Sequence, residues 1–90
     1  MIKRICVLFS GQVQGVGFRF TAESIAKVLG VAGWVKNLHG GGVEVVAEAE
    51  EGILKDFILQ LQNQFSGYIK DTEMTWENPT GEFKEFGVRF

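Results

Sequence analysis

The side chains best suited to chemistry stand in one glycine-bearing stretch, residues 11–19 (GQVQGVGFR). Glycines allow positive φ and let the backbone approach a ligand closely. Successive backbone N–H groups can then converge on one anion, with the start of a helix behind them. Arg19 stands where the loop becomes helical, so its planar guanidinium can close over the same anion. The stretch predicts an anion cradle; the alternative interpretation of Arg19 is an exposed arginine on a helix surface.

A second candidate, Asn37, ends an apolar stretch and precedes the glycine-rich turn of residues 39–42 (HGGG). A carboxamide oxygen can accept a hydrogen bond from water while its NH₂ group donates elsewhere. Asparagine is also common as a plain turn residue, so on the residues alone both interpretations stay open. His39 is the only histidine. Because a histidine without a placed partner rarely forms a catalytic set, we interpret His39 as an exposed turn residue.

Periodicity in the sequence predicts the elements that must position these residues. A continuous apolar run at residues 5–9 predicts a first strand over residues 2–10, with Ile5, Val7 and Phe9 on one face. Both of its faces are largely apolar after Arg4, which favours an interior strand over an edge strand. Apolar residues at helical spacing predict helices over residues 18–29 and about 50–65. Alternation and turn residues predict four more strands, over residues 32–38, 43–48, 68–76 and 83–90.

This order, β-α-β-β-α-β with an extra C-terminal strand, predicts an α+β fold of the ferredoxin-like sandwich type. Right-handed crossovers place both helices on one face of an antiparallel or mixed sheet. The first two strands then run parallel, so the loop of residues 11–17 and Asn37 lie at one edge of the sheet. Ninety residues suffice for one core, and we expect a single domain over residues 1–90.

The composition narrows the possible partners. A formal net charge of -2 gives no long-range attraction for nucleic acid or for an anionic membrane. Cys6 is the only cysteine, so an intrachain disulfide and a cysteine-based zinc site are excluded. We expect Cys6 to be a small apolar residue of the first strand. With no secretory signal or membrane-spanning run, we expect a cytoplasmic monomer that binds neither nucleic acid nor membrane.

Other site types do not match the sequence. The glycine spacing differs from the dinucleotide-binding fingerprint, and the lysine of the phosphate-binding P-loop is missing. We expect the two tryptophans and the phenylalanines to lie in the core. We expect the glutamates at positions 44, 48, 50 and 51 to form a solvated rim and a helix start, without a metal-ligand pattern.

Two stretches together resemble the acylphosphatase family. Residues 11–19 are similar to the family's first signature, and residues 33–44 (GWVKNLHGGGVE) are similar to its second. They lie in the family's order and at about its spacing, and the resemblance covers nearly the whole chain. It implies an enzyme that hydrolyses acyl phosphates, which are carboxyl–phosphate anhydrides, to a carboxylate and inorganic phosphate. It implies no metal and no organic cofactor.

The resemblance also implies roles for individual residues. The arginine that matches Arg19 binds the substrate phosphate together with backbone N–H groups of the preceding loop, and the asparagine that matches Asn37 orients the attacking water. Carried onto this chain, the backbone donors belong to the phosphate loop, which comprises Gln14, Gly15, Val16, Gly17 and Phe18. Departures from the family pattern fall at Lys36, Ala49, residues 40–42 and residues 63–67, and none of them touches Arg19 or Asn37.

Two other classes of function stay open. One is a nucleic-acid-binding domain of the same element order, which would need aromatic side chains on its central strands and a basic surface. The other is a non-catalytic anion-sensing or interaction module that keeps the fold and the loop. A further relative is the acylphosphatase-like amino-terminal domain of the larger carbamoyl-transferring maturation proteins, and we expect a free-standing enzyme instead.

Overall fold

A computed structural model describes all residues from 1 to 90. The helices and strands follow the predicted order. They are β1 (Ile2–Gly11), α1 (Phe18–Leu29), β2 (Ala32–Asn37), β3 (Val43–Glu50), α2 (Glu51–Gln64), β4 (Ile69–Glu77) and β5 (Phe86–Arg89). Neither helix is long and apolar enough to cross a membrane.

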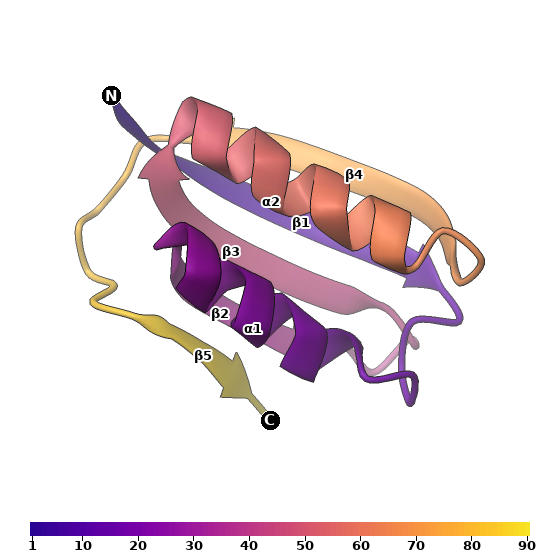
Figure 1. Ribbon diagram of the computed structural model, residues 1–90. Helices are drawn as coiled ribbons and strands as arrows, with labels where there is room; N and C mark the ends of the chain where they lie inside the picture. Colours follow the sequence, from indigo (N-terminus) through magenta and orange to yellow (C-terminus); the bar gives the residue numbers. More distant parts are fainter.

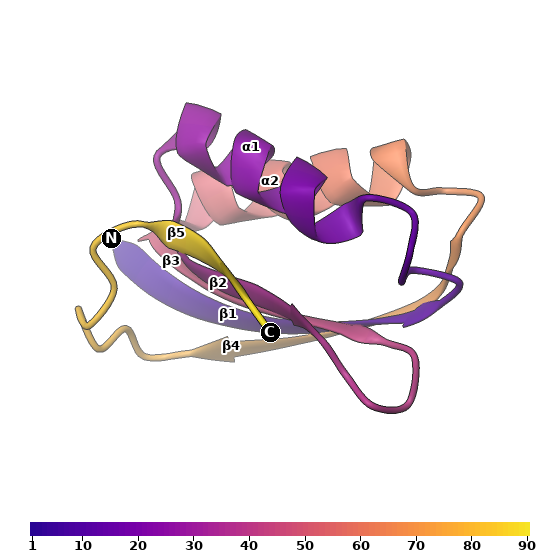
Figure 2. The ribbon, with the colours of Figure 1, turned by 90° about the horizontal axis from the view of Figure 1, so that it is seen from below.

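The strands form one sheet in the order β4-β1-β3-β2-β5. The pairs β4–β1, β1–β3 and β3–β2 are antiparallel, whereas β5 runs parallel to β2. Both helices lie side by side on one face, as Figures 1 and 2 show. The prediction of a ferredoxin-like sandwich with a mixed sheet is therefore confirmed. Since β1 and β2 both pair antiparallel with β3, they run in the same direction, and their C-terminal ends lie at the same end of the sheet.

The core lies between this sheet face and the two helices. Ile5, Val7 and Phe9 of β1 are at most 1% exposed, as predicted from their alternation. Glycine in the left-handed region bounds α1 at both ends, with φ of 82° at Gly17 and 75° at Gly30. The helices contribute residues at helical spacing: Phe18, Ala22 and Ala26 from α1, and Leu54, Phe57, Ile58 and Leu61 from α2.

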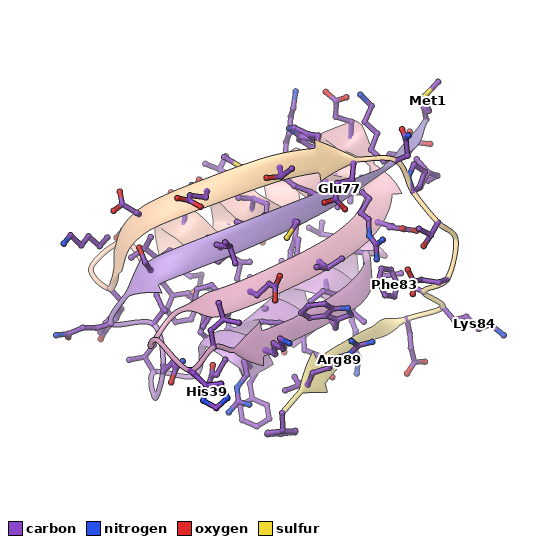
Figure 3. The ribbon with its side chains drawn as sticks, turned by 180° about the vertical axis from the view of Figure 1, so that it is seen from behind. Met1, His39, Glu77, Phe83, Lys84 and Arg89 are labelled. Carbon is purple, nitrogen blue, oxygen red and sulfur yellow. The ribbon has the colours of Figure 1, made fainter.

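The C-terminal strand was predicted three residues too early, and some aromatic residues were wrongly placed in the core. The strand begins at Phe86, because Phe83 belongs to the connection that crosses from β4 at one edge to β5 at the other (Figure 3). Phe20, Trp76 and Phe90 are 67%, 41% and 97% exposed. Apolar residue type alone does not tell a core position from an exposed one.

The prediction that Glu48 belongs to a solvated rim was also wrong, because its side chain is buried. The residue is 7% exposed. Its carboxylate accepts hydrogen bonds from the backbone amides of Thr80 at 2.8 Å and Gly81 at 3.1 Å, and Arg4 Nε lies 3.5 Å away. These contacts anchor the β4–β5 connection to the central strand, which the sequence around Glu48 does not reveal.

The same contacts set the charge of Glu48. Burial alone would raise its pKa, but the donors of Thr80 and Gly81 and the Arg4 charge outweigh burial and hold the pKa below its ordinary value. A carboxyl group whose pKa is lowered by folding stabilises the folded state above its ordinary, unfolded-state pKa. This stabilisation is lost as the pH falls through the lower, folded-state pKa.

We therefore expect Glu48→Gln to lower the free energy of unfolding at pH 7 by about 1.5–3 kcal/mol, the range for hydrogen bonds to a charged group. The difference from the wild type should shrink as the pH falls below the ordinary carboxyl range, because the wild-type carboxylate then becomes protonated. Denaturant unfolding at several pH values measures both effects. The matched control is Glu85→Gln, an exposed glutamate without a recorded ion pair. A pH-independent difference would contradict the role assigned to the Glu48 charge.

Candidate functional site

The loop between β1 and α1 depends on two glycines for its backbone conformation and on one buried valine for its anchoring to the core. Gly15 and Gly17 have φ values of 77° and 82°, a conformation that residues with a side chain rarely adopt. Val13 is fully buried and fixes the start of the loop against the core. The backbone amides of residues 13–17 donate no hydrogen bond to any protein acceptor. The loop therefore presents a run of free N–H groups.

The first turn of α1 adds further donors beside the loop. Helix geometry leaves the first N–H groups without an intrahelical acceptor, and Gly17 supplies no side-chain cap. The turn carries no acidic residue that could compete with a bound anion. Phe18 is 2% exposed, and its ring centroid lies 5.0 Å from that of Phe9 and 4.6 Å from that of Phe65. This packing fixes the position on α1 from which the side chain of the next residue, Arg19, projects.

Arg19 is half-buried and forms no ion pair. Its guanidinium carbon lies 4.7 Å from the centroid of the Phe90 ring, a distance typical of a cation–π contact. A guanidinium that meets no carboxylate keeps its N–H donors available to an external anion. A planar fork of donors suits phosphate, because two parallel N–H···O bonds fix its direction as well as its charge.

Gln14 joins the loop to the hairpin that carries Asn37. Its side-chain Nε2 donates to the carbonyl oxygens of Leu38 at 2.6 Å and Gly42 at 2.9 Å. Asn37 is the last residue of β2 and pairs with Val43 across the hairpin. Two loops that are far apart in sequence are thus held together at the end of the sheet where β1 and β2 finish, as Figures 1 and 2 show.

A shallow cavity of about 330 Å³ lies at this junction. Its lining comprises Gln14, Asn37, Leu38, His39 and Phe90. His39 is exposed at the tip of the hairpin, at the opposite end of the molecule from Met1 (Figure 3). Phe90 borders this cavity and also stacks on Arg19, so the structure brings Arg19 and Asn37 to one end of the molecule. No group of three or more His, Cys, Asp or Glu side chains is placed to hold a metal ion.

The family profile named acylphosphatase matches residues 5–88. The chain belongs to the acylphosphatase family. It is 38% identical over 86 residues to an acylphosphatase of Roseiflexus sp. (strain RS-1), covering 94% of this chain and 92% of that one. It is 44% identical over 69 residues to an acylphosphatase of Methanospirillum hungatei, covering 77% and 76% of the two chains. The crystal structure of acylphosphatase from Bacillus subtilis superposes over 100% of both chains, with a TM-score of 0.90 and 33% identity.

Two features of this acylphosphatase site were missed from the sequence. The side chain of Gln14 is a link between loops, whereas only its backbone amide was expected to matter. Phe90 was expected in the core, yet it stacks on Arg19. Phe90 is brought beside Asn37 by the parallel pairing of β5 with β2 in the register Lys36↔Arg89, and no residue type in the sequence marks that pairing. The acceptors of Gln14 are backbone oxygens, so no residue type marks them.

The sheet face of this acylphosphatase that points away from the helices lacks what the nucleic-acid alternative needs. On its two central strands this face presents no aromatic side chain; the residues are Arg4, Cys6 and Leu8 on β1 and Glu44, Val46 and Glu48 on β3.

Burial and the neighbouring Glu44, whose Oε2 is 3.6 Å from the Cys6 sulfur, raise the pKa of the Cys6 thiol. A thiol with a raised pKa is a poor nucleophile at neutral pH.

Proposed function

We propose that this acylphosphatase holds the substrate phosphate with the backbone amides of residues 14–18 and with Arg19, while Asn37 orients the attacking water. The single observation that carries the proposal is the run of amides over residues 13–17 without protein acceptors, tied by Gln14 to the hairpin of Asn37. The donors and the carboxamide stand on separate loops, and the Gln14 link sets the distance between them.

The chemistry needs little more than these groups. Water attacks phosphorus in line, and the bond from phosphorus to the carboxylate oxygen breaks with its electron pair leaving on that oxygen. The products are a carboxylate and inorganic phosphate, and the proton of the water passes to phosphate or solvent. A carboxylate is a weak base and leaves without a strong general acid. Positioning the water and neutralising the phosphoryl oxygens therefore carry the catalysis.

Arg19 and the loop amides would act on charge, and Asn37 on orientation. In this scheme the amides and the guanidinium would already be in place when the substrate arrives, so they would stabilise the transition state without reorganising. Asn37 would accept one hydrogen bond from the water and so hold it near the attack position, which replaces a search in solution with a prepared geometry. The Gln14 link would keep that geometry from drifting, because it joins the two loops directly.

The first test is the turnover of benzoyl phosphate by the intact chain. We expect hydrolysis with kcat unchanged by a chelator and nearly constant across the middle pH range. A guanidinium and a carboxamide do not change charge there. A kcat that instead rises or falls across the middle pH range would indicate a titrating side chain in catalysis, and His39 beside Asn37 would be the first to examine.

The alternative of a non-catalytic anion-sensing module predicts a different pair of results. Such a module would bind inorganic phosphate, measured by calorimetry, but would not release phosphate from benzoyl phosphate. Binding without turnover would replace the proposed function by this alternative.

A further inference from the structure

We propose that Phe90 positions Arg19 for phosphate binding, by stacking on one face of the guanidinium and leaving its N–H edge free. The inference rests on the proposed function, since it concerns how the proposed phosphate-binding arginine is held. Phe90 touches no reacting atom in this scheme and acts through Arg19. It is therefore a positioning residue.

The first argument comes from strand register. The parallel pair β2–β5 aligns Val35 with Val88 and Lys36 with Arg89. Asn37 then ends β2 and Phe90 follows the last residue of β5. Continuing the register by one residue brings the two level with each other, and both line the same cavity. Val35 is fully buried and Val88 packs against the same core. Because side chains alternate along a strand, Asn37 and Phe90 share this helix-covered face with Arg19 of α1.

The second argument comes from what Phe90 contacts. The residue is 97% exposed, so its ring adds almost nothing to the core. The ring lies over the guanidinium of Arg19, whose central carbon is 4.7 Å from the ring centroid. Phe90 also lines the cavity beside Asn37. Figure 1 shows β5 running beside β2 with the C-terminus beyond its end. The contacts of the ring are therefore with the site and not with the core.

The third argument is an equivalent arrangement elsewhere in the chain. Arg4 stacks on the ring of Phe83 at 4.9 Å, while its Nη2 donates to Glu82 Oε1 at 3.0 Å. A guanidinium in this chain can therefore lie over a phenylalanine ring and bind an anion at the same time. Arg19 has the same stacked face but no carboxylate at its edge. A phosphate group would fill the place that a carboxylate takes at Arg4.

The test measures the affinity for inorganic phosphate by calorimetry and, in turnover assays, as competitive inhibition. We expect Phe90→Ala and Phe90→Leu to weaken phosphate binding about two- to fivefold, which corresponds to the ~0.5–1 kcal/mol of an exposed cation–π contact. Phe90→Tyr and Phe90→Trp keep an aromatic face and should bind phosphate as the wild type does. The matched control is Phe20→Ala, which removes an exposed phenylalanine next to Arg19 in sequence.

Two results would overturn the inference. In the first, Phe90→Leu binds phosphate as tightly as Phe90→Tyr, which would show that apolar bulk and not the aromatic face matters. In the second, Phe90→Ala slows the turnover of benzoyl phosphate but leaves both the turnover of acetyl phosphate and the affinity for inorganic phosphate unchanged. This result would place the ring against the acyl group of the substrate. Calorimetry does not require turnover, so an inactive wild type would defeat the proposed function while the role of Phe90 is still measured.

Discussion

Arg19→Ala should remove nearly all turnover of benzoyl phosphate while the chain still folds. Losing one fixed donor at a developing charge costs about 3–4 kcal/mol, or roughly 10²–10³-fold in kcat, and a guanidinium supplies a full charge besides. Arg19 is only half-buried and forms no ion pair, so the substitution leaves no buried partner unsatisfied. Steady-state kinetics measure the loss, and thermal unfolding checks the fold.

Two further variants separate the guanidinium from positive charge in general. Arg19→Lys keeps the charge but loses the planar fork, so we expect partial activity and weaker phosphate binding. Lys27→Ala removes another cation of the same helix, one that pairs only with Glu23 at 3.7 Å on the exposed surface. It should leave turnover unchanged. An active Arg19→Ala variant would falsify the assignment of Arg19.

The parts of the fold that were predicted correctly are those whose signals are local. The bounds of α1 follow from the apolar stripe of Phe18, Ala22 and Ala26 and from Gly30, which adopts the left-handed conformation that glycine commonly takes after a helix end. β1 was predicted as an interior strand because both of its faces are apolar after Arg4, and it lies between β4 and β3. Neither inference needed knowledge of a distant partner.

The parts that were missed depend on distant partners. Glu48 looks like a surface glutamate in its strand, and it is buried only because residues 80 and 81 close over it. Trp76 has the residue type of a core position, but β4 is an edge strand, and the residue is 41% exposed there. Which strand becomes an edge, and which loop covers a face, is decided by the whole topology. Periodicity within one segment carries no such information.

The candidate site divides in the same way. The glycines at 15 and 17, and their positive φ, were predictable because a cradle of amides needs that conformation. The proximity of Asn37 to the loop followed from the parallel directions of β1 and β2. The Gln14 link was not predictable, since its acceptors are backbone carbonyls that any residue would supply. The sequence therefore indicated the chemical groups, and the structure adds how they are held in place.

Asn37→Ala should lower kcat while leaving phosphate affinity close to that of the wild type. In the proposed scheme Asn37 acts on the water and not on the phosphate, so its loss affects the transition state far more than the bound ground state. A misplaced nucleophile costs about 10²-fold in rate. Asn37 is half-buried at the end of β2, so truncation should change the free energy of unfolding little. Kinetics with benzoyl phosphate and calorimetry with inorganic phosphate separate the two effects.

Asn37→Asp tests the same role with a side chain that keeps a hydrogen-bond acceptor but adds a negative charge. A carboxylate can still accept a hydrogen bond from water, but its negative charge next to the phosphoryl group repels the substrate, so both kcat and phosphate affinity should fall. The matched control is Asn63→Ala, which removes an exposed asparagine on α2 and should change neither quantity. If Asn37→Ala weakened phosphate binding as strongly as it slowed turnover, Asn37 would belong to the phosphate cradle. The water would then need another residue to orient it, and His39 in the same cavity would be the first to examine.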